Sequence, residues 1–463
     1  MAEAGNFTVP VKNFPKRYTP RTGRTGLLFA QVGRTASLCS IIFFLLTTAK
    51  LNEHFMEQLI TTDVNNLVSP AALENPYALY AELRENHPVH YNPMFACWML
   101  TRYEDVSAAL QNKSLSSNWS ETYAFQRELI PSEREALRHI KTYFSLWMQG
   151  MDAPDHTRQR NLANKAFAPS TLKRIRQEVE GIVAALLGEA RAKGYLDIVA
   201  DLAVPLPAAV IFKLLSIPAE GEAYVRATSH TIAEFFGIMN PAPGQLERMS
   251  QVLQQGEEYL KGLIGERRRQ PGDDLLSALI TAEENGQVLG ENELVIICTM
   301  LLFAGHETTT NLISNGTLAL FQHPGELARL RQQPELVELA VEELLRYDSP
   351  VQVIYRSTTV PLTLRGVTIP AGQNIMLVLG AANHDAAKFP EPGQLKLSRQ
   401  DGRHMSFGYG PHFCLGAALA RMEAHVAFTA LLSQFPKLTL AEEHVQRRPN
   451  FALRGLERLK CTF

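Results

Sequence analysis

The stretch FGYGPHFCLG, Phe407–Gly416, places a single cysteine in a glycine-rich loop directly ahead of an apolar, helix-like segment. Gly408 and Gly410 permit backbone turns that bulkier residues resist. The segment that follows, residues 415–432, has the apolar spacing of a helix. Because a helix N-terminus favours negative charge and lowers the pKa of a thiol, Cys414 is placed to be a thiolate.

Several uses of Cys414 are compatible with this setting. A lone cysteine is more often an inert small hydrophobic residue than a ligand. A nucleophilic cysteine needs a base, and His412 is near in sequence, although alternate residues on an open loop need not face each other. A zinc site needs three further ligands, of which only His412 and His404 are near. A haem ligand is the third use, and the loop alone does not choose among them.

A second unusual stretch is the predicted helix Leu294–Gln322. It is apolar on all sides up to Ala304, which predicts burial on all sides. Polar residues then follow from Gly305 to Thr310, with the sequence GHETTT. A buried, unpaired carboxylate costs several kcal/mol, so Glu307 needs a partner, water or a chemical role.

Together these stretches resemble the cytochrome P450 superfamily, whose members hold haem through a cysteine thiolate. The loop is similar to the family's F-G-x-G-x-H-x-C-x-G motif. Three more motifs occur in the family's order: HTRQR (His156–Arg160), AGHETT (Ala304–Thr309) and EELLR (Glu342–Arg346). The likeness covers roughly residue 75 to the C-terminus. It implies a mainly α fold with small β-sheets, in which the haem lies between a long buried distal helix and the proximal cysteine loop and helix.

The resemblance implies a role for each motif. Cys414 is implied as the ligand of the haem iron. Charge-assisted hydrogen bonds are expected to hold the two haem propionates; their implied donors are His156, Arg160, Arg356 and His412. The other implied haem contacts are Ala304, Phe407, Gly408 and Gly416.

Two further groups follow from the same likeness. Glu343 and Arg346 lie three residues apart on one helix face and can pair, and the resemblance adds Arg399 as a third, structural member. Glu307 and Thr308 are implied as the catalytic pair that relays protons to reduced dioxygen.

The implied reaction is that of a monooxygenase, with haem b and O2 as cofactors and hydroxylation or epoxidation of a largely apolar small molecule. No flavin-binding domain is attached, so electrons from NAD(P)H are expected to arrive indirectly, through a reductase and a ferredoxin or flavodoxin that docks near Cys414. Two alternatives remain: a haem-thiolate ligand or gas sensor without turnover, and a peroxide-driven oxidase. The pair Glu307 and Thr308 argues against both.

The substrate pocket is expected to involve Val351, Val353 and Ile354. The excursion Lys113–Asp152 has mixed polarity and weak periodicity, and it is read either as a long segment that shapes the ligand pocket or as an irregular surface loop with a short helix. The stretch Ile232–Asn240 is also expected to contribute to the pocket. Their side chains indicate only a largely apolar ligand, so polyketide, fatty acyl and terpenoid substrates all stay open.

Composition sets the outer limits. The chain has 463 residues, 46% hydrophobic and 20% charged, and no linker divides it after residue 60, so we expect one catalytic domain, 56–463, behind a basic extension, 1–55. That extension is read as a disordered leader, a targeting or membrane-surface segment, or the product of an over-extended start codon. The first fifty residues carry seven bases and one acid, which leaves 38 bases and 46 acids elsewhere and argues against nucleic-acid binding.

Cysteine usage and apolar runs give the remaining expectations. The five cysteines are widely spaced and contain no C-x-x-C pair, which fits a reducing cytoplasm. The longest apolar run in the extension, Ile41–Leu46, is far shorter than the ~20 residues that span a bilayer. We therefore expect a cytoplasmic monomer with no membrane anchor.

Overall fold

The computed structural model describes residues 63–118, 128–167, 169–236, 241–442 and 444–463. From Val64 to Phe463 the described residues belong to one compact unit. The basic extension predicted for residues 1–55 lies outside the described residues, so the predicted domain boundary stays a prediction.

Helices make up most of this unit, as the sequence predicted. They are α2 (Pro70–Glu74), α3 (Tyr77–Asn86), α4 (Tyr103–Gln111), α5 (Pro131–Ser145), α6 (Asp155–Ala166), α7 (Pro169–Lys193), α8 (Pro205–Leu215), α9 (Ala219–Phe236), α10 (Gln245–Arg269), α11 (Leu275–Thr281), α12 (Glu291–Gln322), α13 (Pro324–Gln332), α14 (Val337–Tyr347), α15 (Leu379–Ala382) and α16 (Ala417–Gln434). Short 3-10 or π turns are η2 (Met148–Gly150), η3 (Ile198–Ala203), η4 (Pro334–Leu336) and η5 (Gly410–His412).

The strands are few and short. They are β1 (Val89–Asn92), β2 (Cys97–Leu100), β3 (Leu115–Ser116), β4 (Leu196–Asp197), β5 (Glu283–Glu284), β6 (Gln287–Val288), β7 (Val353–Thr358), β8 (Leu362–Leu364), β9 (Val367–Ile369), β10 (Asn374–Val378), β11 (Thr439–Leu440) and β12 (Lys460–Thr462). The largest sheet has the order β1-β2-β10-β7-β3.

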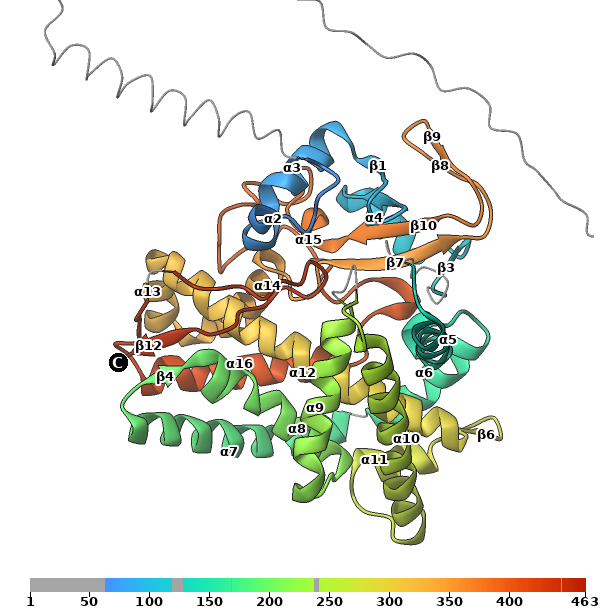
Figure 1. Ribbon diagram of the computed structural model, residues 1–463. Coiled ribbons are helices and arrows are strands. Elements are labelled where there is room, and N and C mark those ends of the chain that lie inside the picture. The colour runs from blue at the N-terminus through green and yellow to red at the C-terminus, as the bar shows by residue number, and fades with distance from the viewer. Residues whose placement is uncertain (1–62, 119–127, 168, 237–240, 443) are drawn as a thin grey trace, which may run out of the picture. The chain divides into compact units, whose positions relative to one another are not determined.

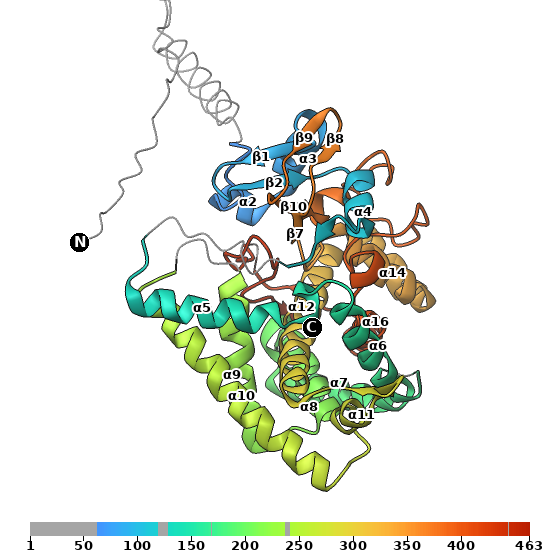
Figure 2. The ribbon, with the colours of Figure 1, turned by 90° about the vertical axis from the view of Figure 1, so that its right-hand side faces the viewer.

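Helix α12 forms the centre of the helical part (Figure 1). Helices α8, α9, α10, α14 and α16 all contact it. Figure 2 shows α9 and α10 on one side of α12 and α16 on the other. The side chains from Leu294 to Phe303 are buried, as the all-round apolar pattern predicted, because a helix without a polar face has no side to turn to water.

The five-stranded sheet separates two apolar clusters. Side chains alternate between the faces of a strand, and in β7 Val353 joins the cluster with Leu79 and Met376, while Ile354 packs on the opposite cluster. Arg356, two residues after Ile354, lies on the Ile354 face and is paired in register with Ile375 of β10. This register fixes the direction of the Arg356 side chain.

The excursion Lys113–Asp152 contains more regular structure than the sequence indicated. Its described part holds β3 and the 15-residue helix α5. Ala136, Ile140, Tyr143 and Phe144 form the buried face of α5, at the three- and four-residue spacing of an amphipathic helix. The alternative of an irregular surface loop with a short helix is therefore wrong, because acidic and basic residues interleaved with this face obscured its period.

One helical stretch in the described part of the chain, Ile198–Leu215, is apolar and long enough to cross a membrane, and 67% of it is buried inside the fold. A core helix meets the same criteria.

Candidate active site

The loop that carries Cys414 is held in place by its own backbone. The N–H of Cys414 donates to the carbonyl of Phe407 at 2.9 Å. Gly408 and Gly410 have φ of 69° and 70°, a region that residues with a Cβ rarely adopt. A Cβ at Gly410 would also lie 2.9 Å from the carbonyl oxygen of Leu110. The predicted need for glycine is thus both conformational and steric at Gly410.

The other end of the loop leads into α16, which begins at Ala417 with Gly416 at its N-cap. Gly416 has a negative φ of −85° and open space where a Cβ would lie, so its contribution is its backbone N–H, which donates toward the Cys414 sulfur. Burial raises the pKa of the Cys414 thiol, and the Gly416 N–H, Arg160 and Arg421 oppose that rise. The predicted lowering of this pKa is wrong for the protein alone, because burial outweighs the helix N-terminus.

The Cys414 residue is nevertheless exposed by its accessible surface. Cys414 would be the residue that holds the iron of a bound haem.

The structure disfavours the zinc and nucleophile alternatives for Cys414. Among the described residues, no group of three or more His, Cys, Asp or Glu side chains could hold a metal ion. His412, the candidate base, places its Nε2 2.9 Å from the Ser117 hydroxyl, and its ring lies 3.9 Å from the His156 ring, centroid to centroid. His412 is thus engaged away from the sulfur.

The four predicted propionate donors come together from α6, β7 and the cysteine loop. Burial, followed by the charges of His156, Arg356 and Arg160, lowers the pKa of His412 to about 3. Burial also lowers the pKa of Arg356 to about 10, and it lowers the pKa of His156 and of Arg160. The charges of Arg160 and Arg356 act on both histidines, and the two imidazole rings lie 3.9 Å apart, so the four donors lie in one neighbourhood.

Such a group of donors fits the carboxylates of a haem. Among the described residues, Asp152 is the acid whose charge acts on His156 and Arg356, and it is already engaged by the Ser117 N–H at 2.8 Å. The two propionate carboxylates of a haem would offset the repulsion among the positively charged donors. Arg160 also influences Cys414, which places the donors beside the accessible sulfur. The residues present therefore fit a haem held by Cys414.

The polar island of α12 is the segment Gly305–Thr310. Its buried carboxylate, Glu307, has the charged partner that burial requires. Glu307 is 8% exposed and forms an ion pair with Arg448, which follows β11 in the C-terminal segment. The Thr308 hydroxyl donates to the Ala304 carbonyl at 2.7 Å, four residues earlier in the helix. His306 contacts the Val204 carbonyl at 3.2 Å through Nε2 and is a packing residue in this structure.

Glu343, Arg346 and Arg399 form one buried cluster. Glu343 accepts from Arg346 at 2.7 and 2.9 Å and from Arg399 at 3.0 Å. Arg346 also donates to the carbonyls of Asn383 and Pro392 at 2.8 and 2.9 Å. The cluster thereby fixes the segment that leads from α15 toward the cysteine loop.

A second ion-pair group was missed by the sequence reasoning. Glu342 accepts from Arg421 at 2.6 and 2.8 Å and lies 3.2 Å from Nε2 of His404. The Arg421 guanidinium also lies 4.4 Å from the centre of the Phe407 ring, which places Phe407 against α16. Burial acts to raise the pKa of Glu342, but the bonds from Arg421 and His404 outweigh it and hold this pKa at about 2. In the sequence, the only sign of this pairing is that Glu342 is an acidic residue next to Glu343.

The predicted pocket residues divide between the two faces of β7. Ile354 shares the face of Arg356, and Val351, half-buried, packs on the same cluster as Ile354. Val353 packs on the opposite face with Leu79, because alternate residues of a strand face opposite sides. The place of these three residues in the substrate pocket stays a prediction. Parts of the other predicted stretches, residues 119–127 and 237–240, lie outside the described residues.

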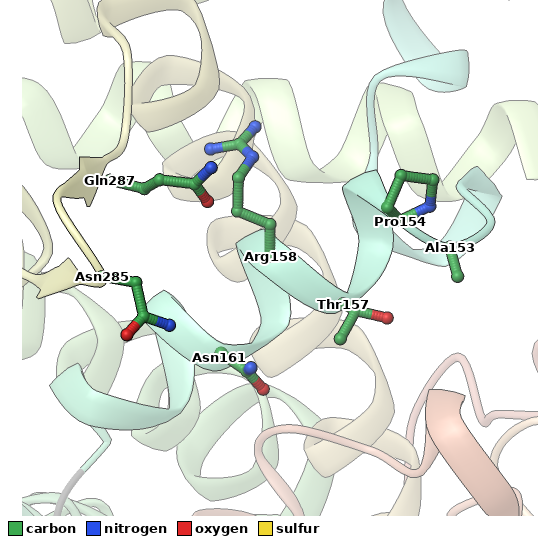
Figure 3. Close-up of a pocket in the computed structure, with 7 residues that line it drawn as sticks. All are labelled: Ala153, Pro154, Thr157, Arg158, Asn161, Asn285 and Gln287. Atoms are coloured by element: carbon green, nitrogen blue, oxygen red, sulfur yellow. The ribbon is translucent and has the colours of Figure 1, made fainter.

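A separate surface pocket lies where α6 meets the β5–β6 hairpin (Figure 3). Its lining residues are Ala153, Pro154, Thr157, Arg158, Asn161, Asn285 and Gln287. None of them is a predicted haem or substrate contact. On α6, Thr157 and Arg158 belong to this pocket whereas His156 and Arg160 belong to the donor cluster, so the helix turns different faces to the two places.

Comparison with known proteins gives a consistent family. A family model for cytochrome P450 matches residues 79–458. The chain is 38% identical over 394 residues to the polyketide biosynthesis cytochrome P450 PksS of Bacillus subtilis, covering 83% of this chain and 95% of the relative. It is 36% identical over 404 residues to the 6-deoxyerythronolide B hydroxylase of Saccharopolyspora erythraea, covering 86% and 98%.

Solved structures agree. The structure of P450BioI in complex with an acyl carrier protein ligated to hexadec-9Z-enoic acid has a TM-score of 0.77 and 34% identity, covering 84% of this chain and 98% of that chain. Relatives named as hydroxylases are monooxygenases, and the mainly α fold with small sheets is confirmed. The chain belongs to the cytochrome P450 family of monooxygenases.

Proposed function

We propose that the protein inserts one oxygen atom of O2 into a largely apolar small molecule, by hydroxylation or epoxidation. Electrons come from NAD(P)H through a separate ferredoxin or flavodoxin and its reductase. The observation that carries this proposal is the pair of Glu307 and Thr308, which follows the buried and largely apolar stretch Leu294–Phe303 of helix α12. A sensor or a peroxide-driven oxidase has no use for an acid and an alcohol that carry protons.

The chain's own residues supply the surroundings of the reaction. Bound haem, ligated by Cys414, would activate O2, because thiolate donation favours O–O cleavage. His156, Arg160, Arg356 and His412 would hold the propionates. The Thr308 hydroxyl, which donates to the Ala304 carbonyl, can hold a water, and the Glu307 carboxyl group can take up a proton from solvent and pass it to that water.

An aromatic cluster supports the apolar substrate. Phe303, directly before Ala304 on α12, stacks on Phe236 with ring centroids 5.1 Å apart and lies 5.7 Å from Trp147. Phe144 of α5 packs edge-on against Trp147 at 4.7 Å. These buried rings surround the residue directly before Ala304, and apolar surroundings of this kind favour a substrate with hydrocarbon surface.

The electron donor is proposed to dock on the face that carries the cysteine loop. The exposed Arg403 lies over the rings of Tyr409 and Phe413, at 4.8 and 4.3 Å from their centres. A positive group on this rim suits an acidic ferredoxin or flavodoxin. The cysteines within the described residues are free thiols, which supports a reducing cytoplasm.

The domain assignment is tested by truncation. Removal of residues 1–55 should leave haem content and melting temperature unchanged if residues 56–463 are the catalytic domain, because chain ends outside a fold add little stability. Loss of haem on truncation would instead assign part of the extension to the domain.

The experiment for the function combines binding and turnover. Purified holoenzyme is screened with testosterone, a macrolactone, and hexadec-9-enoic acid, free and carrier-bound, for a shift of the haem Soret band. Probes that bind are then incubated with NADPH, a surrogate ferredoxin and its reductase under isotopically heavy O2. A product with one heavy oxygen atom supports the proposal. Binding without NADPH consumption would favour a ligand sensor, and product formation with peroxide alone a peroxide-driven oxidase.

A further inference from the structure

A cavity of about 850 Å³ lies at the C-terminal end of α12, away from the candidate active site. Leu318 at this end lies about 21 Å along the helix axis from Ala304, because an α-helix rises about 1.5 Å per residue. Helix α13 and the segments around β11 and β12 complete the lining, and α13 and β12 lie at this end of the helical part in Figure 1. The volume falls within the range of about 300–1,000 Å³ that is typical of sites for small organic molecules.

Apolar side chains from three separate segments line this cavity. Leu318 of α12, Leu327 of α13 and Leu438 before β11 are buried, whereas Phe321 and Leu440 are half-buried. A hydrocarbon chain that covers these side chains would remove apolar surface from water on both partners, which favours binding.

The charged part of the lining is mainly positive. Of its three arginines, Arg447 is paired with the buried Asp348 at 3.1 Å, and Arg458 is paired with Glu442 at 3.3 Å. Arg331 is the third. Within the described part of the chain, the charged and titratable residues of the lining are Arg331, Arg447, Arg458, His444 and Glu74.

Arg331 lacks the acidic partner that the other two arginines have. Its Nη2 donates to the Leu438 carbonyl at 3.0 Å, but its Nε is buried without a hydrogen-bond partner among the described residues, and no described carboxylate forms an ion pair with it. A buried donor without a partner costs free energy, and a guanidinium binds carboxylates through paired N–H groups. Arg331 therefore favours a ligand that carries a carboxylate.

We propose that this cavity is a small-molecule site, separate from the haem site, for a carboxylate with an unbranched hydrocarbon chain, a free fatty acid. The carboxylate pairs with Arg331, and the chain lies against Leu318, Phe321 and Leu440. A small inorganic anion would leave these apolar side chains in water, and a neutral hydrocarbon would leave Arg331 unpaired. An amphipathic acid meets both requirements, and its binding is non-covalent.

The test is a calorimetric titration of the holoenzyme with dodecanoic acid. The haem site is first filled with a bulky aryl imidazole that ligates the iron, and the Soret band confirms its occupancy. One equivalent of dodecanoic acid should still bind to this blocked wild type. In Arg331→Gln the affinity should fall about tenfold or more, because a charge-assisted hydrogen bond is lost. Dodecan-1-ol, which keeps the chain without the charge, should bind more weakly than the acid and equally to both proteins.

Two further variants separate the cavity from the rest of the surface. Leu440→Trp places a larger side chain in the cavity and should abolish detectable binding of both the acid and the alcohol. Arg329→Gln is the matched control on α13, because Arg329 lies 4.0 Å from Glu326 and does not line the cavity; this variant should bind dodecanoic acid as the wild type does. Haem content and melting temperature report whether each variant is folded.

A second measurement needs no substitution and covers the case in which a variant does not fold. Dodecanoic acid with a diazirine at its chain end, irradiated with the blocked wild type, should label peptides that contain Leu318 and Phe321 or Leu438 and Leu440. The inference would be overturned by absence of binding to the blocked wild type or by a label confined to other parts of the chain. Equal binding of the acid to wild type, Arg331→Gln and Leu440→Trp, or equal affinity of the wild type for acid and alcohol, would overturn it as well.

Discussion

The two sides of the candidate site, the cysteine loop and the polar island of α12, are held by very different amounts of structure. On the cysteine side, Glu343 accepts from two arginines, and Arg346 binds the carbonyls that lead toward the loop. On the α12 side, Glu307 has one arginine and Thr308 bonds back to its own helix. The comparison indicates that the cysteine side is cross-linked by several charged groups, whereas the α12 side is held by one ion pair and one bond within its own helix and is therefore freer to rearrange.

The largest effect is expected at Cys414. In Cys414→Ser the reduced carbon monoxide complex should lose its thiolate-type spectrum completely, because a hydroxyl ionises far less readily than a thiol. Cys97→Ala, which removes a buried thiol from the sheet, should keep the spectrum. A wild-type spectrum in Cys414→Ser would refute the haem assignment and with it the comparison.

The second prediction concerns the cysteine side, where Glu343 pairs with two arginines. Glu343→Gln leaves two buried arginines without their carboxylate, which should cost about 3–5 kcal/mol of stability and lower haem retention. The measurement is denaturant unfolding together with haem content. Glu338→Gln, at an exposed position on the same helix, should change neither. Equal stability of the two variants would mean that the cluster does not hold the loop.

The third prediction concerns the α12 side of the site. There we expect NADPH consumption to become uncoupled from product formation, without a loss of protein stability. Thr308→Ala should bind substrate and accept the first electron as the wild type does, while product per NADPH falls by about tenfold or more and peroxide rises, because positioned proton transfer contributes about 10²–10⁴-fold. Thr317→Ala is the matched control, since its hydroxyl also bonds back four residues, to Ile313, at 2.8 Å. Wild-type coupling in Thr308→Ala would reduce Thr308 to a packing residue.

The smallest effect concerns the partly exposed Glu342. Its pKa is lowered from 4.5 to about 2 in the folded protein, so its pairing with Arg421 and His404 stabilises the fold above pH 4.5 and is lost as the pH falls toward 2. Glu342→Gln should therefore lower stability at pH 7 by less than about 1 kcal/mol. Melting temperatures of the two proteins should differ by a constant amount from pH 7 to 5 and converge below. A difference that grows on acidification would contradict this sign.

Much of the cysteine side could be read from the sequence, because its motifs are local. The glycines around Cys414 and the three-residue spacing of Glu343 and Arg346 prescribe a turn and a helical pair wherever they occur. The burial of residues 294–303 of α12 was also predictable, because this stretch has no polar face. Local rules decided these features before any long-range contact was known.

The tertiary structure alone decided which residues complete the site. Arg448 lies 141 residues after Glu307 and Arg421 lies 79 residues after Glu342, and no local pattern links positions so far apart. The face on which Val353 lies was set by the strand register of β7 against β10, and the pKa of the Cys414 thiol by burial rather than by the helix that follows it. Pairing and desolvation depend on what the fold brings together, so the sequence determined the chemistry of the site and the packing determined its partners.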